Sequence, residues 1–385
     1  IDMSYTSLHN HSMYSILDGY ATPKEYLERA KEIGLKGFCI SEHGNQYSWV
    51  YFDELKKDYP DLKMIYGVEL YECFDINTQD KDNKYFHLLA ICKNEQGRIA
   101  LNEIVTKSNL EGFYYKPRVD LNMLKPYAEH LIICSACLAS KLSREDDYQK
   151  CIEYVNEYKM IFPHFYLEIQ SHSSIDQQNY NQKILQLSKD TNTPFVITTD
   201  SHAAIKEDLY YQARHVQIAH DDETLTESYE GCYLQTEEEI HEILDKQIGK
   251  ENVDIGLKNT NIICDLVEEV NMPFQDPQLP TFPLPEGYKD NHEYLKKLTQ
   301  DGWIKRKYND LPNEEIKKRK DRLKYELSII KQMNYDGYFL IVWDFINWAK
   351  QNGIFVGPGR GSAGGSIVCY LLGISELDPI KYDLI

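Results

Sequence analysis

Metal-binding side chains recur through residues 1–202, where short apolar runs of the chain end. GFCIS, MIYGVEL, LIICSA and PFVITT have the length and composition of buried strands. Seven side chains of this kind flank such runs: His9, His11, His43, Glu69, Cys137, Asp200 and His202. Residues at the ends of different strands converge only when the strands lie side by side, as on the carboxyl-end rim of a barrel. The sequence therefore predicts a metal cluster at a barrel mouth.

Two of these ligands, His9 and His11, form an H-x-H pair whose imidazoles point the same way on a strand, because side chains alternate with period two. Imidazole nitrogen suits zinc, manganese and iron, and carboxylates help to bridge pairs of ions. Such a cluster is the usual equipment for hydrolysing phosphate esters. Asp18 is a further candidate from the loop YSILDGY, whereas His87 opens its apolar run and fits the strand-end rule poorly. Taken singly, each residue reads as an ordinary structural side chain; the set as a whole does not.

The first part of the chain alternates apolar runs with helical patterns such as PKEYLERAKEIGL. Strands alternating with helices predict parallel pairing, in an α/β barrel or a doubly wound sheet, and the ligands favour the barrel. Residues 272–288 are rich in proline and predict an extended linker. We therefore expect a first domain over 1–271 and a second over 289–385. In the second, residues 290–351 predict helices and IFV at 354–356 predicts a strand.

Composition narrows the class of protein. No run of about 18 apolar residues is present, so neither a transmembrane helix nor a membrane partner is expected. The N-terminus lacks the basic and apolar segments of a secretory signal. Nine cysteines, odd in number and several of them inside apolar runs, indicate reduced thiols in a cytoplasmic compartment.

The net charge of −19 argues against a protein that wraps DNA with its whole surface. One basic stretch stands out, with Lys305, Arg306 and Lys307 followed by a denser group from Lys317 to Lys324. It has two readings: a solvated helix with intrahelical Glu–Lys pairs, or a local DNA-binding face. The sequence favours the first and leaves the second open.

A glycine-rich loop, VGPGRGSAGGS, occupies residues 356–366. Glycines let backbone N–H groups approach phosphate oxygens, and an arginine adds a bidentate contact. The loop is neither a Walker A motif, since G-K-[ST] is missing, nor a dinucleotide-binding fingerprint. The residues predicted to bind a triphosphate are Gly359, Arg360, Gly361 and Ser362. The alternative is a flexible interdomain turn.

Together, the ligand pattern and the loop resemble one family, the bacterial and phage DNA polymerase III alpha subunits, which are C-family replicative polymerases. The first domain is similar to the PHP domain of that family, a distorted (β/α)7 barrel. The resemblance assigns the metal site to His9, His11, Asp18, His43, Glu69, His87, Cys137, Asp200 and His202. It implies two to three divalent ions, zinc, manganese or iron, with Asp200, His202, His11 and Glu69 as catalytic residues.

The second domain resembles the beginning of the polymerase palm, a mixed α/β domain of the Polβ-like type that is incomplete here. The match runs from DGYFLIVWDFINWAK through VGPGRGSAGGS to LDPIKYDLI; Ala363-Gly364 stands where the family usually has Gly-Ala. The family's catalytic aspartates, in a P-D-x-D-x-D motif, lie beyond the matched segment, and so do the thumb, fingers and clamp-binding region. We therefore expect an N-terminal piece of a polymerase.

The resemblance also implies partners. These are primer–template DNA, deoxynucleoside triphosphates, the remaining polymerase segment with its thumb, fingers and catalytic palm, and the sliding clamp through that segment. Magnesium would serve the polymerase site outside this chain. The compartment would be the cytoplasm of a bacterium or of a phage-infected host.

Three functions remain open at this point. The first is a polymerase segment whose PHP domain is a metal-dependent 3′–5′ proofreading exonuclease. The second is the same polymerase with a metal-stabilised PHP scaffold that has no nuclease activity. The third is a free-standing PHP phosphoesterase acting on a small substrate such as histidinol phosphate, which the glycine-rich loop and the match over the second domain disfavour.

Overall fold

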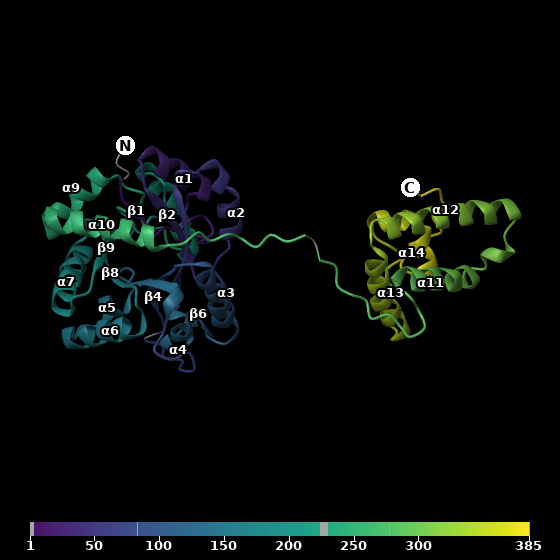
Figure 1. Cartoon of the computed structure of the whole chain (residues 1–385), viewed down its shortest axis with the longest axis horizontal. Coiled ribbons are helices and arrows are strands. Elements are labelled where there is room, and N and C mark those ends of the chain that lie inside the picture. Colours follow the sequence, from purple (N-terminus) through teal and green to yellow (C-terminus); the bar gives the residue numbers. More distant parts are fainter. Residues whose placement is uncertain (1–3, 83, 224–229, 277, 385) are drawn as a thin grey trace. The chain divides into compact units, whose positions relative to one another are not determined.

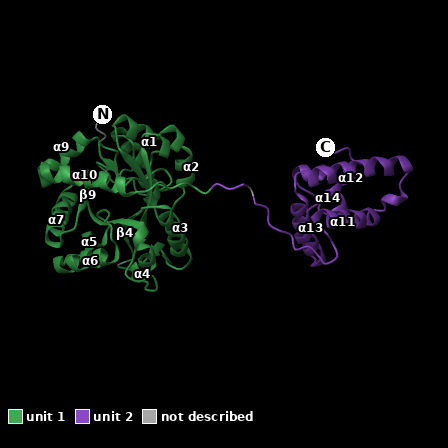
Figure 2. Cartoon of the chain, viewed as in Figure 1, with its two compact units in different colours: residues 1–273 green, residues 274–385 purple. Residues whose placement is uncertain are grey.

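The computed structural model describes residues 4–82, 84–223, 230–276 and 278–384. The chain forms two compact units, residues 1–273 and residues 274–385 (Figure 2). Each unit has its own hydrophobic core, and each is described by itself.

Unit 1 is built on a nine-stranded sheet whose main path runs β1-β2-β3-β4-β7-β8-β9. The strands are β1 (Thr6–Ser7), β2 (Gly37–His43), β3 (Lys63–Glu72), β4 (Phe86–Cys92), β5 (Phe113–Tyr114), β6 (Lys116–Val119), β7 (Leu131–Cys134), β8 (Phe165–Gln170) and β9 (Phe195–Thr198). A parallel bridge between Asn10 and Ser201 links the segment after β1 to the segment after β9. The His11 amide donates to the Ser201 carbonyl at 2.7 Å there, so the sheet curls into a nearly closed barrel, as predicted.

Helices surround the strands on the outside of the barrel (Figure 1). They are α1 (Pro23–Glu32), α2 (Trp49–Glu54), α3 (Glu95–Leu110), α4 (Leu121–Leu124), α5 (Lys141–Arg144), α6 (Tyr148–Ile161), α7 (Ile175–Thr191), α8 (Leu209–His220), α9 (Glu237–Ile248) and α10 (Lys250–Leu266). α1 starts at a capping box made by Thr22 and Glu25, with Pro23 in its first turn. α10 packs closely on β9 because Gly256 has no side chain; a Cβ there would lie 2.7 Å from the side chain of Ile197.

The expectation of parallel pairing is wrong for β4 and for the short β5, which runs antiparallel to β6. β4 runs antiparallel to both of its neighbours, β3 and β7, while β1–β2, β2–β3, β7–β8 and β8–β9 are parallel. The connection from β3 to β4 contains no helix over its described residues, and without a helical crossover the chain returns beside β3 in the opposite direction. The start of β4 therefore lies at the same end of the barrel as the end of β3.

Unit 2 is helical over its described residues. Its helices are α11 (Asn291–Lys305), α12 (Asn313–Gln332), α13 (Asp336–Gln351) and α14 (Ile367–Leu372). Its core gathers Leu295, Leu327, Leu340 and Val368, and Phe282 from the proline-rich segment packs against it. The strand predicted at 354–356 is not formed: these residues have no regular secondary structure, and Phe355 is 92% exposed.

No helix among the described residues combines the length and the apolarity needed to cross a bilayer.

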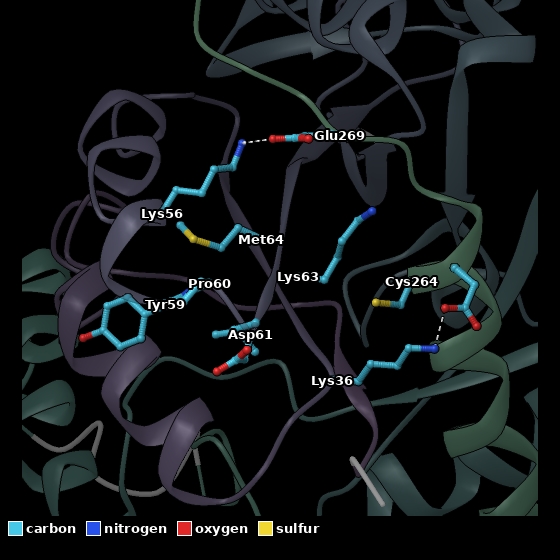
Figure 3. A pocket seen from close by; sticks show the side chains of 11 residues that line it. Lys36, Lys56, Tyr59, Pro60, Asp61, Lys63, Met64, Cys264 and Glu269 are labelled. Carbon is cyan, nitrogen blue, oxygen red and sulfur yellow. Dashed lines mark hydrogen bonds and ion pairs between the residues drawn. The ribbon is translucent and has the colours of Figure 1, made fainter.

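A hollow opens beside the amino ends of β2 and β3 (Figure 3). Its charged lining residues are Lys36, Lys56, Lys63, Asp61, Asp265 and Glu269. Lys36 bonds to Asp265, and the Lys56 ammonium lies 3.9 Å from the Glu269 carboxylate. Cations and carboxylates are matched in this hollow, and it lies at the opposite end of these strands from His43 and Glu69.

Candidate metal centre

The nine predicted ligands lie together at one end of the barrel. They are His9 and His11 after β1, Asp18 in the loop before α1, His43 at the end of β2, Glu69 in β3, His87 near the start of β4, Cys137 after β7, and Asp200 and His202 after β9. Seven of them lie where apolar runs end, and Asp18 comes from a neighbouring loop. His87 joins them because β4 is reversed, so the beginning of this strand reaches the rim where its neighbours end.

Glu69 is the centre of the cluster and is 1% exposed. Its Oε2 lies 2.7 Å from His43 Nδ1 and 3.4 Å from His11 Nε2. Its Oε1 lies 3.2 Å from His9 Nε2 and 3.0 Å from His87 Nδ1. A single carboxylate thus faces four imidazoles, an arrangement suited to bridging two ions.

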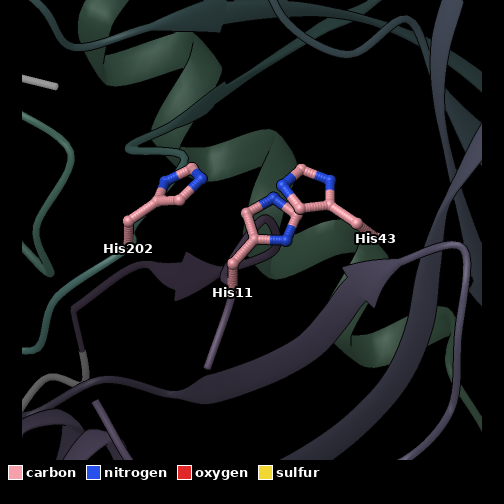
Figure 4. Close-up of side chains that lie close together, drawn as sticks. All are labelled: His11, His43 and His202. Carbon is pink, nitrogen blue, oxygen red and sulfur yellow. The ribbon is translucent and has the colours of Figure 1, made fainter. Parts of the chain in front are cut away.

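Two aspartates, Asp200 and Asp18, also face the histidines of the cluster. Asp200 Oδ1 lies 3.3 Å from His9 Nε2 and 3.2 Å from His11 Nε2. Asp18 Oδ2 lies 2.6 Å from His43 Nε2 and 3.2 Å from His202 Nε2. The rings of His11, His43 and His202 lie against one another, with the first two stacked at 3.9 Å between centroids (Figure 4).

Cys137 lies beside His87 and Glu69. Its Sγ is 3.5 Å from His87 Nδ1 and 3.7 Å from Glu69 Oε1. The structure therefore places all nine predicted ligands in one contiguous set.

The buried polar atoms fit divalent ions. Several inward-facing atoms are buried and face one another as carboxylate–imidazole pairs without forming hydrogen bonds of good geometry: His9 Nε2, His11 Nε2, His43 Nδ1, Glu69 Oε2 and Asp200 Oδ1. Burying polar groups without hydrogen bonds is costly, and these are nitrogen and oxygen atoms of the kind that bind zinc, manganese or iron. Three overlapping triplets have ligand atoms within 4.8 Å of one another: His11–His43–His202, His9–His11–Glu69 and His43–Glu69–His87.

The protonation states of His11 and His43 affect how readily each ring can bind an ion. Burial, helped by the neighbouring His43, lowers the pKa of His11 to about 3, so its ring is neutral at pH 7 and can donate a lone pair. For His43, burial lowers the pKa, but the Glu69 and Asp18 carboxylates outweigh it and raise the value to about 9. An ion bound by His43 must displace this proton, so its binding is favoured by higher pH.

Glu168 in β8 is a buried carboxylate that the sequence analysis missed, and it bonds to the ring nitrogen of His9 that points away from Glu69. Glu168 Oε1 accepts from His9 Nδ1 at 2.7 Å, from the Thr198 hydroxyl at 2.6 Å and from the Gln170 amide at 3.0 Å. Because a carboxylate only accepts, this contact holds a proton of His9 on Nδ1. Burial lowers the pKa of His9, but the Asp200, Glu168 and Glu69 carboxylates outweigh it and raise the pKa, so an ion binding at Nε2 would displace the second proton. The signal in the sequence was a glutamate inside the apolar run FYLEIQ.

Glu42 in β2, also missed, supports His11 through a serine. Ser15 Oγ donates to Glu42 Oε2 at 2.6 Å and lies 3.4 Å from His11 Nδ1. Glu42 also accepts from the Ser12 amide at 3.0 Å, so it anchors the loop that carries Asp18. The hydroxyl of Ser15 can accept the Nδ1 proton of His11 and leave Nε2 free for an ion.

His172, which follows β8, is buried beside the cluster. Its Nε2 lies 2.9 Å from the Thr199 carbonyl and 3.4 Å from Cys232 Sγ. The Cys232 carbonyl accepts from the His202 amide at 2.8 Å. This pair holds the backbone on either side of Asp200, and the Cys232 side chain also hydrogen-bonds to His202.

Replacing Glu168 tests the support of His9. Glu168→Ala is expected to weaken metal binding about 10–100-fold, the usual effect of losing an orienting partner of a histidine ligand. Glu168→Gln keeps an acceptor for His9 Nδ1 and should recover much of the affinity. Competition with a chromophoric chelator measures this, with Glu153→Ala on the exposed side of α6 as control. Wild-type affinity in Glu168→Ala would contradict the assignment.

The glycine-rich loop lies in unit 2, before α14. Gly359 and Gly361 have φ of +146° and +57°, conformations that favour glycine, and Arg360 is exposed. The amino end of α14 is already occupied by a carboxylate of this chain: Glu326 in α12 accepts from the Ser366 hydroxyl at 2.7 Å and from the Val368 amide at 3.1 Å. A phosphate at this loop would therefore contact residues 359–362 and not the end of α14.

Two family models match this chain, one in each of its two units. The PHP domain model matches residues 7–172, which hold seven of the nine ligands and Glu168, and the model of the bacterial DNA polymerase III alpha NTPase domain matches residues 293–385. DNA polymerase III subunit alpha of Borreliella burgdorferi is 35% identical over 99% of this chain and 33% of its own length. That of Aquifex aeolicus is 36% identical over 98% of this chain and 34% of its own length.

Among solved structures, a chain from Bifidobacterium adolescentis provisionally described as a metal-dependent phosphoesterase is 12% identical, with a TM-score of 0.37, over 63% of this chain and 96% of its own. So distant a likeness carries no argument. The sequence matches do, although this chain spans only about a third of the length of the curated relatives. The chain belongs to the bacterial DNA polymerase III alpha family, with a PHP domain and part of the alpha NTPase domain.

Proposed function

We propose that this chain is part of a replicative DNA polymerase whose PHP domain is a metal-dependent 3′–5′ proofreading exonuclease. The observation that carries the proposal is the convergence of all nine predicted ligands at one end of the barrel, with the Glu69 carboxylate facing four imidazoles. A metal-stabilised scaffold would use the same ligands, so a nuclease assay has to separate the two readings. We propose two to three ions of zinc, manganese or iron, a PHP domain over 1–271, a linker over 272–288 and a palm segment over 289–385.

The ligand side chains differ in depth, and this suggests the direction of substrate. His9, His11 and Glu69 are at most 1% exposed, whereas Asp18 is 22% and His87 16% exposed. A phosphodiester would approach from the side of Asp18, His43 and His87. The buried residues would form the floor that fixes the ions.

Divalent ions bound here would supply a nucleophilic water at neutral pH and stabilise charge on the phosphoryl oxygens. The side chains of this chain orient the ligand atoms. Glu69 and Asp200 each face at least two histidines, and Glu168 holds a proton of His9 on Nδ1, the ring nitrogen that points away from the cluster. His11 stays neutral, and His202 is held by its backbone contact to Cys232. These are the reasons to assign catalytic roles to Asp200, His202, His11 and Glu69.

The wider role is proposed from the family. The partners would be primer–template DNA, deoxynucleoside triphosphates and the remaining polymerase segment with thumb, fingers and catalytic palm, which would bring magnesium and the sliding clamp. The site of action would be the bacterial cytoplasm or that of a phage-infected host. The alternatives are a PHP scaffold without nuclease activity and a free-standing phosphoesterase.

An assay of nuclease activity decides between the exonuclease, the scaffold and the small-molecule phosphoesterase. The chain should release single nucleotides from the 3′ end of a labelled, mismatched primer when manganese, zinc or iron is supplied. Metal-loaded protein that leaves the primer intact would establish the scaffold. Hydrolysis of histidinol phosphate without hydrolysis of the primer would establish the small-molecule phosphoesterase.

Arg360→Ala tests the nucleotide-binding loop, for which we propose Gly359, Arg360, Gly361 and Ser362. Losing one charge-assisted hydrogen bond of about 1.5–3 kcal/mol should weaken binding of a deoxynucleoside triphosphate about 10- to 100-fold. Ligand-observed NMR titration of the chain measures it. Ser362→Ala should have a smaller effect, since a hydroxyl contact is neutral. Equal affinity in wild type and Arg360→Ala would favour a turn that binds no nucleotide.

A further inference from the structure

The basic stretch of the sequence is divided by the fold into two groups with different surroundings. Arg319 is 4% exposed and is bonded to Glu315 and, at 3.1 Å, to Asp378. Arg322 pairs with Glu326 at 2.7 Å, the carboxylate that holds the amino end of α14. Arg319 thus ties α12 to Asp378, and Arg322 also donates to the Gly365 carbonyl at 3.2 Å, so both arginines are engaged within unit 2.

The lysines on another side of α12 line a groove between α11 and α12. The groove is lined by His292, Lys296, Thr299, Gln300, Lys320, Leu323, Lys324, Leu327, Ser328 and Lys331. Its four lysines are exposed, and no ion pair is recorded for any of them among the described residues of the chain. No carboxylate is among the described lining residues, unlike the hollow of Figure 3, where cations and acids are matched.

Helical spacing explains why these charges form a row. Residues three or four apart share one face of a helix, and Lys320, Lys324 and Lys331 follow positions i, i+4 and i+11. Lys296 faces them from α11. The row is about 16 Å long at 1.5 Å per residue, enough to follow several phosphates of a strand whose charges recur about every 3.4 Å.

We infer that the groove between α11 and α12 binds the phosphodiester backbone of a DNA strand, as a contact separate from the glycine-rich loop. The floor is made of Leu323, Leu327 and Thr299 and offers no pattern of donors for reading bases, so the contact is independent of sequence. In a chain of net charge −19, a row of four lysines that form no ion pair within the described parts of the chain concentrates attraction for a polyanion at one place. The inference rests on the proposed role in DNA replication.

The test is the salt dependence of binding of the whole chain to a fluorescent single-stranded oligonucleotide, with a chelator present so that nothing is cleaved. Each phosphate contact contributes about 0.7 to the slope of log affinity against log salt. The triple variant Lys320→Gln, Lys324→Gln, Lys331→Gln should flatten the slope by about 2. The matched control, Lys305→Gln, Lys317→Gln, Lys318→Gln, removes the same charge from exposed lysines outside the groove and should keep the wild-type slope.

Equal loss in both triple variants would mean diffuse attraction and would overturn the groove. Absence of oligonucleotide binding by wild type at low salt would overturn it as well. Inorganic phosphate that displaces the oligonucleotide as effectively as an equal concentration of DNA phosphate would assign the groove to a free anion instead. Metal content and 3′–5′ hydrolysis are measured separately on both variants, so a failure of the proposed nuclease and a failure of the groove are distinguishable.

Discussion

Asp200→Asn should lower the release of 3′ nucleotides from a mismatched primer by at least about 10²-fold. The Asp200 carboxylate faces both His9 and His11, and an amide removes its negative charge while keeping its shape. The loss is on the order of removing one contact that stabilises the transition state. The measurement is single-nucleotide release from a labelled primer, with the fold checked by circular dichroism.

Asparagine is the right replacement because of the backbone. Asp200 has φ of +47°, the left-handed region, which asparagine tolerates far better than most other residues, so Asp200→Ala would mix a loss of charge with backbone strain. Asp190→Asn, in an exposed position of α7, is the control for a lost carboxylate far from the rim. Degradation by Asp200→Asn at the wild-type rate would assign the activity to another site or to a contaminant.

Removing metal with a chelator should lower the melting temperature of unit 1 by about 5–10 °C. An ion that binds only the folded state at 100 times its dissociation constant stabilises it by about 2.7 kcal/mol, and for large domains each kcal/mol shifts the melting temperature by about 2–4 °C. Elemental analysis of protein purified without chelator should find more than one ion per chain. Scanning calorimetry with and without chelator, followed by restored zinc or manganese, measures the shift.

Glu69→Ala should abolish that shift, since this carboxylate faces four histidines of the cluster. Glu28→Ala, an exposed carboxylate on α1, should keep it. Metal-free wild type with unchanged melting temperature and an intact fold would refute the metal assignment as a whole.

The sequence predicted the barrel and the convergence of its ligands because both depend on a local signal, a metal-binding side chain at the end of an apolar run. His87 escaped that rule because strand direction is not local: it depends on whether a helix separates two strands, and none lies in the described part of the connection from β3 to β4. The strand expected at 354–356 failed for a related reason. Apolar residues predict a strand only where another strand is available, and among the described residues Ile354 to Val356 have none beside them.

The sequence shows Glu168 as a glutamate inside an apolar run, but it does not show which side chain that carboxylate, or Glu42, supports. Glu168 and Glu42 lie within apolar runs, and their role depends on contacts with residues 159 and 27 positions away, His9 and Ser15. The basic stretch needed tertiary contacts as well. Arg319 is removed from any binding face by Asp378, which is distant in sequence, so spacing alone could not separate it from Lys320 and Lys324.

The bridge between Asn10 and Ser201 has a consequence for the order in which the protein assembles. Two ligands follow the first strand and two follow the last strand of the main path, so this pairing closes a loop that contains nearly all of the barrel. Long-range closure is entropically the slowest kind of contact to form, whereas β3 and β4 are neighbours along the chain. The complete ligand set does not exist in any partly folded chain in which this closure is open, so a loaded cluster is a mark of a finished barrel.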